Sequence, residues 1–486
     1  MRIHNIFLLF LFCVAGFFAT YHLTESPPVW MDEGIFAQAA ANLSLHGQVG
    51  LQVAPDTIEP SSKLITAGYP FIYPLAGWFK TFGVSILSAR SLMAIFIIGF
   101  LLASYVFVRR LFGPWQALGV LALLATLPTL YGNGKSVLGE VPGLLYLVAS
   151  LLCVGVARMR TTQRYQWFAL AGLFAGLCVV TKPIFILFIP AALIGLGIAW
   201  KRREMARWEI GTTIGSGLVP VLAWLVIQFR VSDSAGSLLS FYVNHYQVAD
   251  WSSTILANLR NLVTDIGPLY LLAVLCIWLI AYCIRLRRRE RIFVEEHMAF
   301  AFSIFTLLGY LTTAGWYRYL FEAQALSLIF LPNALSIVTQ KIIQNNISKK
   351  LVIAVVALLS LLGAYQVMFS SFVAESYGRQ QTAFWEEYFK TAPPSTSFFF
   401  YDVPEVAFFA QGQTYYQYLN PMDSLNLNIL GWDVGREQIS IIARGDADVV
   451  ILPPAIYEKK KSDLFSGYEI DRTIHNYDFL KKMKKK

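Results

Sequence analysis

Long apolar segments recur along this chain, and they constrain its fold more than any other feature. Stretches of about 18–20 apolar residues, flanked by Arg or Lys, are typical of helices that cross a membrane. Composition agrees, because 56% of the 486 residues are hydrophobic and only 14% are charged. An average soluble domain has about 45–50% apolar and about 25% charged residues. The sequence therefore predicts an α-helical, polytopic membrane protein.

Basic residues gather in short clusters between the apolar segments, and these clusters carry much of the net charge of +9. Loops rich in Lys and Arg stay on the cytoplasmic side of a membrane. With the clusters at 109–110, 158–164, 201–203 and 285–291 placed inside, the chain crosses the membrane about eleven times. The charge thus orients the chain, and nucleic acid is not a predicted partner. The predicted spans lie near 5–22, 84–107, 114–132, 139–157, 166–181, 183–200, 209–229, 266–284, 297–315, 318–340 and 351–370.

Two segments depart from the pattern of long spans. Residues 68–82 are short, aromatic and contain proline, which favours an interfacial or re-entrant segment. Beyond the last span, strand-like runs at 397–402, 446–454 and 468–479 accompany a helix-like run at 434–445. The sequence therefore predicts a transmembrane domain over 1–370, with an outer loop at 23–67, and a small extracytoplasmic α/β domain over 371–486.

Charged residues collect on the outer side of this predicted topology. Such groups cost several kcal/mol at membrane depth and need a partner, a wet cavity or a function. Their collection at the outer ends of the spans indicates one extracytoplasmic site. The set consists of Asp32 and Glu33 in the outer loop, with Arg90, Lys135, Glu140, Lys182 and Arg318.

The types of charge in this set suggest a reaction. Lys182, Arg318 and Arg90 are suited to bind a phosphate, Arg by bidentate contacts and Lys as a point charge. Asp32 is suited to accept a proton from a hydroxyl group. Transfer of a sugar from a lipid phosphate needs both, a base for the acceptor and cations for the departing phosphate. Glycosyl transfer is therefore the hypothesis that these residues favour.

Each of these residues also has a purely structural interpretation. Asp32 and Glu33 would form the polar start of a surface helix, Arg318 would anchor a span at the interface, and Lys182 would reach the headgroups. For the whole chain, the alternatives are a transporter or flippase of a lipid-linked sugar and a non-catalytic scaffold. Transporters usually contain internal repeats and helices broken near the midplane. No repeat is evident here, so the sequence favours the enzyme.

Several motifs resemble the GT-C membrane glycosyltransferases, in the branch of the protein O-mannosyltransferases and aminoarabinose transferases (glycosyltransferase family 39-like). The first is WMDEGIFAQAAANLSLHGQ, which resembles the carboxylate-bearing first loop of that family and its alanine-rich helix. The others follow in the order of the family and extend the resemblance over most of residues 1–340. They are GYPFIYPLAGWF, SARSLMAIF, GEVPGLLYLVAS, GLFAGLCVVTKPIFILFIP and WYRYLFEAQALSLIFLP.

The resemblance implies an inverting transfer of a sugar from a polyprenyl-phosphate donor on the extracytoplasmic face of a plasma or inner membrane. It implies that Asp32 is the general base, that Glu33 beside it shapes the site, and that Glu140 is a second acidic residue. The acceptor would be a hydroxyl of a lipid, glycan or protein, and membrane lipids surround the enzyme. No cofactor is required by the resemblance, while two outer carboxylates are also compatible with a divalent cation.

The remaining matches concern substrate binding. Lys182 and Arg318 correspond to basic residues near the donor phosphate, Tyr319 lines the site, and Arg90 corresponds to an arginine that follows the re-entrant segment. The chain departs from the family where relatives often carry Lys-Pro-Pro or His-Pro-Pro, because it has Gly-Tyr69-Pro. Lys63, from the preceding loop, is the candidate to replace the missing cation. The 139–142 turn also has Glu where many relatives have Asp.

Overall fold

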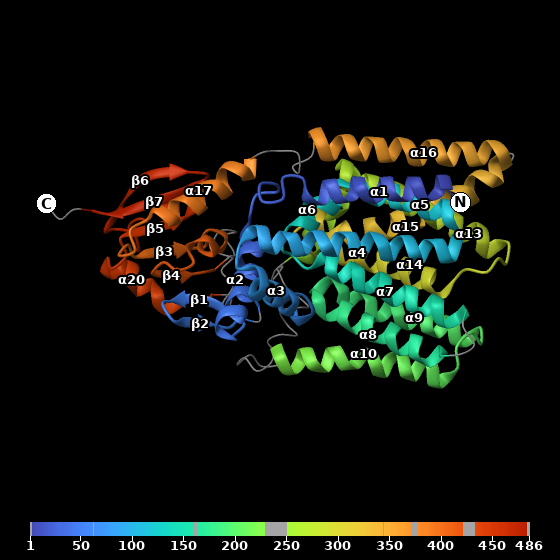
Figure 1. Ribbon diagram of the computed structural model, residues 1–486, viewed down its shortest axis with the longest axis horizontal. Helices are drawn as coiled ribbons and strands as arrows, with labels where there is room; N and C mark the ends of the chain where they lie inside the picture. The colour runs from blue at the N-terminus through green and yellow to red at the C-terminus, as the bar shows by residue number, and fades with distance from the viewer. Residues whose placement is uncertain are drawn as a thin grey trace.

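Long helices lie side by side in a bundle, and a β-sheet sits beyond one end of it (Figure 1). The computed structural model describes residues 2–61, 63–159, 163–228, 250–343, 345–370, 377–420 and 433–483. We call the bundle end near the sheet the sheet end, and the opposite end, where the chain begins, the N-terminal end. The predicted boundary at 370/371 adjoins residues 371–376, which lie outside the described ranges.

The helices of the bundle follow the apolar segments of the sequence. Nine helices in the described ranges are long and apolar enough to cross a membrane, or ten if the bent pair α5 and α6 is one span. Helix α14, 17 residues long, occupies the remaining predicted position. The predicted helical, multi-pass membrane class is therefore confirmed. The bounds are α1 (Arg2–Thr20), α4 (Ile86–Phe112), α5 (Pro114–Ala125), α6 (Pro128–Lys135), α7 (Glu140–Met159), α8 (Arg164–Thr181), η1 (Pro183–Leu187), α9 (Phe188–Lys201), α10 (Arg207–Gln228), α12 (Trp251–Thr264), α13 (Ile266–Arg287), α14 (Val294–Tyr310), η2 (Tyr317–Leu320), α15 (Phe321–Ile342), α16 (Asn345–Tyr365) and the π-helical turn η3 (Gln366–Ser370).

Local sequence explains where several of these helices begin and end. Ser85 caps α4, because its hydroxyl accepts a hydrogen bond from the Ser88 amide at 3.0 Å. Gly113, with φ of 96°, ends α4, and Pro114 starts α5 at a position where proline needs no amide donor. In the bundle core, Trp278 stacks on Phe330 with ring centroids 4.5 Å apart. Local capping and turn residues therefore set the ends of α4 and α5, and aromatic packing holds the bundle core together.

Four shorter elements cover the sheet end of the bundle. They are α2 (Met31–His46), the hairpin β1 (Leu51–Ala54) and β2 (Thr57–Glu59), and α3 (Tyr69–Phe82). Helix α3 has 14 residues, or about 21 Å, which is shorter than a hydrocarbon core of about 30 Å. This length fits the interfacial or re-entrant segment predicted at 68–82.

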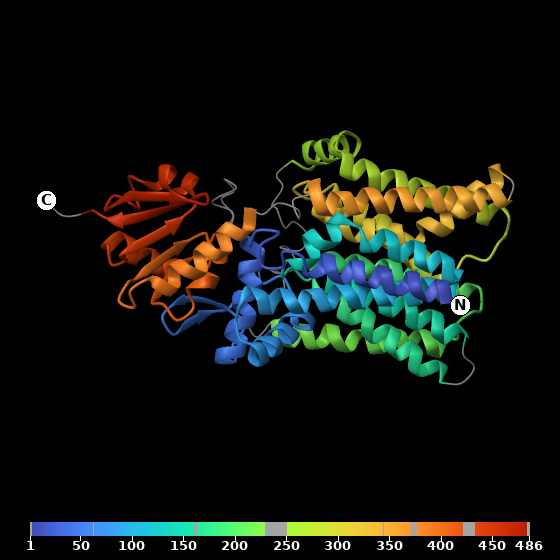
Figure 2. The ribbon, with the colours of Figure 1, turned by 45° about the horizontal axis from the view of Figure 1, so that its top comes forward.

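The C-terminal part is a five-stranded mixed sheet in the order β4-β3-β5-β7-β6. Strand β3 is parallel to β4 and β5, whereas β7 is antiparallel to β5 and β6. Helix α17 packs on one face of the sheet (Figure 2), where Phe389 contacts Phe398 and Trp385 stacks on Phe479. The bounds are α17 (Tyr377–Thr391), β3 (Phe398–Tyr401), α18 (Pro404–Ala407), η4 (Phe408–Ala410), β4 (Tyr415–Tyr418), η5 (Arg436–Gln438), α20 (Ile439–Arg444), β5 (Val449–Leu452), α21 (Pro454–Lys460), β6 (Tyr468–Ile474) and β7 (Tyr477–Lys482).

The sheet differs from the sequence prediction in two places. The single strand predicted at 468–479 is wrong, because β6 and β7 form a hairpin there. His475 and Asn476 make the turn with φ of 51° and 65°, the positive values that a tight two-residue hairpin turn requires. Strand β4 at the edge of the sheet was not predicted at all. The α/β character itself is confirmed.

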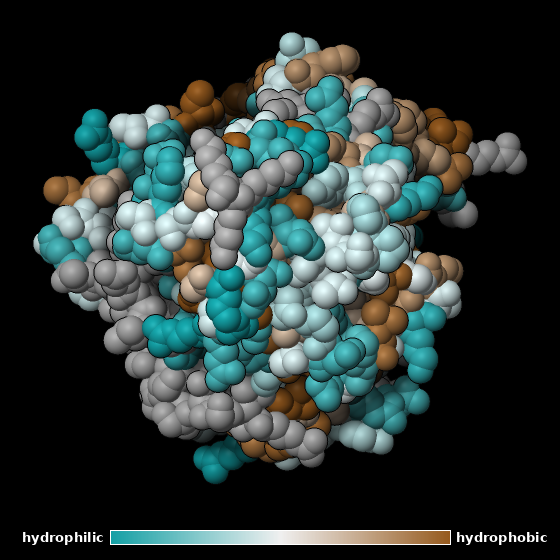
Figure 3. All heavy atoms as spheres, turned by 90° about the vertical axis from the view of Figure 1, so that its left-hand side faces the viewer, coloured by the Kyte–Doolittle hydropathy of each residue, from teal (hydrophilic) through white to brown (hydrophobic). Residues whose placement is uncertain are grey.

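The two parts present different surfaces. The face of the sheet part that points away from the bundle carries mainly hydrophilic residues (Figure 3). The helices of the bundle expose large apolar side chains such as Leu102, Leu193 and Leu361. An apolar belt beside a polar cap is the surface expected of a membrane protein whose sheet part lies in water.

Candidate active site

Asp32 lies in the first turn of α2, at the sheet end of the bundle. A carboxylate is favourable in this position, because the amide groups at a helix N-terminus carry partial positive charge. The Oδ2 atom of Asp32 is 2.9 Å from Nη1 of Arg318, and the Asp32 side chain is 28% exposed. Arg318 belongs to η2, which leads into α15. The structure therefore joins two predicted site residues that are far apart in the sequence.

Aromatic rings surround the guanidinium group of Arg318. Its Cζ atom lies 4.4 Å from the centre of the Trp30 ring, 5.1 Å from Trp316 and 5.2 Å from Tyr319. Nη2 also donates to the Tyr319 hydroxyl at 3.4 Å. Cation–π contacts of this kind hold a guanidinium in place and keep its charge. Arg318 is thus a fixed cation whose acidic partner, Asp32, is partly open to solvent.

Lys182 and Glu140 form a second ion pair near the same end. The Lys182 ammonium contacts Glu140 Oε1 and donates to the Leu138 carbonyl at 2.9 Å. It also lies 5.7 Å from the centre of the Phe36 ring on α2. Glu140 acts electrostatically on Arg318 as well, so the two ion pairs belong to one charged cluster.

Glu322 joins this cluster, although the sequence analysis did not select it. Its side chain is 1% exposed, and Oε2 has no hydrogen-bond partner among the described residues. Glu140, Lys182 and Arg318 all act on it electrostatically. The residue was missed because it stands inside an apolar span. Its signal was the spacing of four residues from Arg318, which brings two side chains to one face of a helix.

Glu33 and Arg90 form a different kind of contact. Nε and Nη2 of Arg90 donate to the two carboxylate oxygens of Glu33 at 2.8 and 2.7 Å, and both side chains are fully buried. Arg90 also donates to the Leu23 carbonyl, and Glu33 accepts from the Val137 amide. This bidentate pair ties α2 to α4. The geometry favours a positioning part for Glu33 and Arg90 rather than contact with a substrate.

The other predicted residues lie around the cluster. Lys135 is buried and donates to the carbonyls of Tyr21 and Ser26. Tyr69, at the start of α3, donates to the Pro220 carbonyl at 3.5 Å and contacts Tyr73 rather than the charged cluster. Lys63 is half-buried in the loop before α3. In the described ranges, no three His, Cys, Asp or Glu side chains come together as a metal site.

The sheet part holds α2 from the other side. Gln38 of α2 donates to the Pro404 carbonyl at 2.7 Å. Gly34 is so close to α18 that an added Cβ atom would lie 2.4 Å from the Glu405 amide nitrogen. The β1–β2 hairpin is also tied to the sheet part, because Glu59 accepts a hydrogen bond from the Gly435 amide at 2.9 Å. The helix that carries Asp32 is therefore fixed between the bundle and the sheet.

Comparisons with known proteins agree with this architecture. The family model of dolichyl-phosphate-mannose-protein mannosyltransferase matches residues 70–227. ArnT from Cupriavidus metallidurans in the apo state superposes with a TM-score of 0.65 at 13% identity, covering 98% of both chains. The same protein bound to undecaprenyl phosphate gives 0.63 at 12% identity, covering 97% of both chains.

A more distant structure has the same fold. The oligosaccharyltransferase AglB from Archaeoglobus fulgidus, in complex with an inhibitory peptide and a dolichol-phosphate, gives a TM-score of 0.52 at 12% identity. That match covers 97% of this chain and 74% of AglB. No sequence among the curated proteins matches significantly. The fold expected from the resemblance is confirmed: the chain has the fold of ArnT over nearly its full length, and the mannosyltransferase family model matches residues 70–227.

Proposed function

We propose that this protein is an inverting glycosyltransferase that moves a sugar from a polyprenyl-phosphate donor to an acceptor hydroxyl on the extracytoplasmic face. The observation that carries the proposal is the partly exposed Asp32–Arg318 ion pair, with the Glu140–Lys182 pair beside it. Undecaprenyl phosphate in ArnT and dolichol-phosphate in AglB support a lipid phosphate as the carrier. The acceptor belongs to a lipid, a glycan or a protein.

The proposed roles follow from the charges. Arg318 and Lys182 bind the donor phosphate, and the acceptor hydroxyl oxygen attacks the anomeric carbon from the opposite side. The bond between that carbon and the phosphate oxygen breaks, and the phosphate keeps the electron pair. Asp32 accepts the proton of the hydroxyl, while the two cations stabilise the charge that develops on the phosphate. Opposite-side attack inverts the configuration of the sugar.

The ion pairs suggest an order of binding. Without donor, Arg318 neutralises Asp32 and therefore weakens it as a base. A phosphate at Arg318 competes with Asp32 for the guanidinium and releases the carboxylate toward the acceptor. The same competition at Lys182 releases Glu140. Donor binding thus prepares the base, which stays neutralised by Arg318 while no donor is bound.

The remaining residues have supporting roles in this proposal. Glu33 and Arg90 position α2, and Tyr319 holds Arg318 while lining the site. Lys63 and Tyr69 contact the donor or the acceptor from the loop and helix before the second span. The extracytoplasmic domain over 371–486 supports α2 from outside the membrane.

The test uses purified protein in nanodiscs with a panel of polyprenyl-phosphate sugars, following release of polyprenyl phosphate. We expect Asp32→Asn to lower kcat by about 10²–10⁴-fold, the usual effect of losing a general base. Donor affinity should stay equal or rise, because Arg318 loses its internal competitor. Asp56→Asn is the matched control, since Asp56 is exposed in the same outer loop and its φ of 59° suits Asn. Unchanged release by a folded Asp32→Asn protein would remove Asp32 from the mechanism.

A further inference from the structure

A cavity of about 360 Å³ opens at the N-terminal end of the bundle, where α8 begins, α9 ends and α10 begins. Its wall includes Arg164, Trp200, Arg203, Glu204, Arg207 and Glu209. Helix α8 separates the cavity from Lys182 by 18 residues, or about 27 Å. The cavity is therefore distinct from the candidate active site.

The two acids in the wall already have partners. Glu209 lies 2.8 Å from Nε of Arg164 and accepts a hydrogen bond from the Ala206 amide. Glu204 lies 3.2 Å from Arg158 and 3.4 Å from Arg291. These acids therefore contribute no free negative charge to the cavity.

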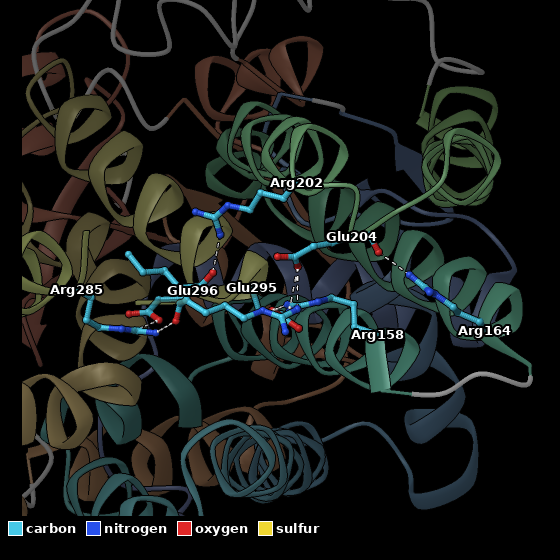
Figure 4. Close-up of polar contacts among 9 residues, drawn as sticks. Arg158, Arg164, Arg202, Glu204, Arg285, Glu295 and Glu296 are labelled. Carbon is cyan, nitrogen blue, oxygen red and sulfur yellow. Dashed lines mark hydrogen bonds and ion pairs between the residues drawn. The ribbon is translucent and has the colours of Figure 1, made fainter. Parts of the chain in front are cut away.

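The partners of Glu204 belong to a larger network of ion pairs that joins the helix ends (Figure 4). Arg158 contacts Glu295 at 2.5 Å, and Arg285 contacts Glu296 at 2.6 Å. Glu295 and Glu296 are buried at the start of α14. The glutamates at the N-terminal end of the bundle therefore form ion pairs with arginines inside the bundle. The arginines at the rim of the cavity are not neutralised by these glutamates.

Arg203 and Arg207 are those rim arginines. Within the part of the chain that the structure describes, neither has an acidic partner. Arg207 lies over the Trp200 ring, with its Cζ atom 5.7 Å from the ring centre. Arg203 sits in a left-handed turn with φ of 57°, held by a hydrogen bond from its amide to the Trp200 carbonyl. Two exposed arginines therefore line a cavity whose acids are neutralised.

The surroundings place this cavity at headgroup depth. Trp200 in the cavity wall and Trp208, which follows Arg207 in the sequence, are 53% and 57% exposed, and exposed tryptophans gather at membrane interfaces. Exposed apolar residues continue from there along the outer faces of α9 and α10, among them Leu193 and Leu218. A ligand in this cavity would thus have acyl chains against apolar side chains and a headgroup among arginines.

We propose that this cavity binds the phosphate of an anionic phospholipid in the leaflet at the N-terminal end of the bundle. Its volume equals that of about twelve waters, which leaves room for a phosphate and a small polar headgroup. Basic pockets between membrane helices are suited to such headgroups. The lipid would join the start of α10 to the end of α9. The bound lipid would hold α10 in place, because outward residues of this helix such as Leu222 and Val226 are largely exposed.

Native mass spectrometry on the full-length protein tests the proposal, with phosphatidylglycerol and phosphatidylcholine as probes. We expect Arg203→Gln/Arg207→Gln to weaken phosphatidylglycerol binding by roughly 10–30-fold, the effect of removing two basic residues near a lipid surface. The matched control is Arg109→Gln/Arg110→Gln, which removes two exposed arginines from the end of α4, away from the cavity. This control should bind phosphatidylglycerol as the natural protein does.

Further measurements separate phosphate recognition from other causes. Arg203→Lys/Arg207→Lys keeps both charges and should retain most of the binding. Loss in this variant as large as in the glutamine variant would overturn the charge argument. Equal loss in the Arg109 and Arg110 control would show general surface attraction and also overturn the site. Competition by glycerol phosphate as strong as by phosphatidylglycerol would identify a soluble phosphate site and overturn the lipid assignment.

Discussion

Asp32 and Glu33 are adjacent in the sequence, yet their carboxylates have different surroundings. Asp32 is 28% exposed and has one partner that a substrate can replace, Arg318. Glu33 is fully buried, and Arg90 holds both of its oxygens. Partly exposed ion pairs contribute little to stability, whereas removal of one member of a buried pair leaves an uncompensated charge. The two acids therefore differ in what a substitution at each should change.

Glu33→Gln should destabilise the protein by about 3–5 kcal/mol, because Arg90 would stay buried without a counter-charge. Asp32→Asn should change stability by less than about 1 kcal/mol, since its ion pair is partly solvated. Thermal unfolding of both variants in the same detergent measures the difference. If the two variants unfold together, the Glu33–Arg90 pair does not support α2 as we infer.

Arg318→Ala should weaken donor binding by about 10–100-fold, the loss expected for charge-assisted contacts to a phosphate. Acceptor binding should change much less, because the proposed acceptor contact is Asp32. Titration with polyprenyl phosphate alone measures the affinity for the phosphate part of the donor. Arg260→Ala is the control, since Arg260 is exposed on α12 and lies outside the charged cluster. Equal affinity in the Arg318 and Arg260 variants would contradict the phosphate role.

The sequence was sufficient to identify most residues of the charged cluster at the candidate site, but not to predict which of them form ion pairs. Charge at the outer ends of spans predicted Asp32, Glu140, Lys182 and Arg318, because ionisable groups at membrane depth are rare. The pairing depends on how helices pack, which no local pattern encodes. Glu322 was lost for another reason, since the apolar residues around it made the segment look like an ordinary span.

At the scale of elements, α2 depends on contacts with the sheet part. Gly34 permits α18 to approach α2, and Gln38 bonds to the Pro404 carbonyl. These contacts were not predictable, because they join residues more than 360 positions apart. The helices themselves were predictable from long apolar runs. Strand β4 was missed although Gly412 precedes it and Asn420-Pro421 follows it in the sequence, because a run of four residues is short for a strand, whereas the turn at His475 and Asn476 contains no glycine or proline.

We expect the buried Glu405 to make the contact between α18 and the sheet sensitive to pH. Its side chain is buried and accepts a hydrogen bond from the Tyr477 hydroxyl at 2.8 Å, and burial raises the pKa of Glu405 from 4.5 to about 7. The folded protein therefore binds a proton that the unfolded chain has released between these pH values. The contribution of Glu405 to the free energy of unfolding should fall as pH rises from about 4.5 to 7, and it should stay low above pH 7.

Glu405→Gln should remove this dependence, because the amide keeps an acceptor for Tyr477 and carries no charge. At pH 8 the variant should be more stable than the natural protein, by up to about 3 kcal/mol. Thermal unfolding at pH 5, 6, 7 and 8 would measure it. Glu387→Gln, at an exposed position on α17, is the matched control. The same pH slope in all three proteins would show that Glu405 is ionised without cost in the folded state.

At the scale of the whole molecule, the bundle has two chemically different ends. The sheet end carries the Asp32–Arg318 and Glu140–Lys182 pairs, while the N-terminal end carries the ion-pair network of Figure 4 and the exposed basic clusters. Loops rich in Lys and Arg stay in the cytoplasm. The charge distribution therefore supports our proposal that the candidate active site lies on the extracytoplasmic side, where lipid-linked sugars would meet their acceptors.

Cysteine labelling tests this orientation. Asp56→Cys reports on the hairpin at the sheet end, and Arg287→Cys reports on the exposed last turn of α13. The background needs Cys13, Cys276 and Cys283 replaced by Ala, because these three are exposed. An impermeant maleimide added to intact cells should label Asp56→Cys directly and Arg287→Cys only after permeabilisation. The reverse pattern would place the candidate site in the cytoplasm and the basic clusters outside, and it would contradict the proposed extracytoplasmic reaction.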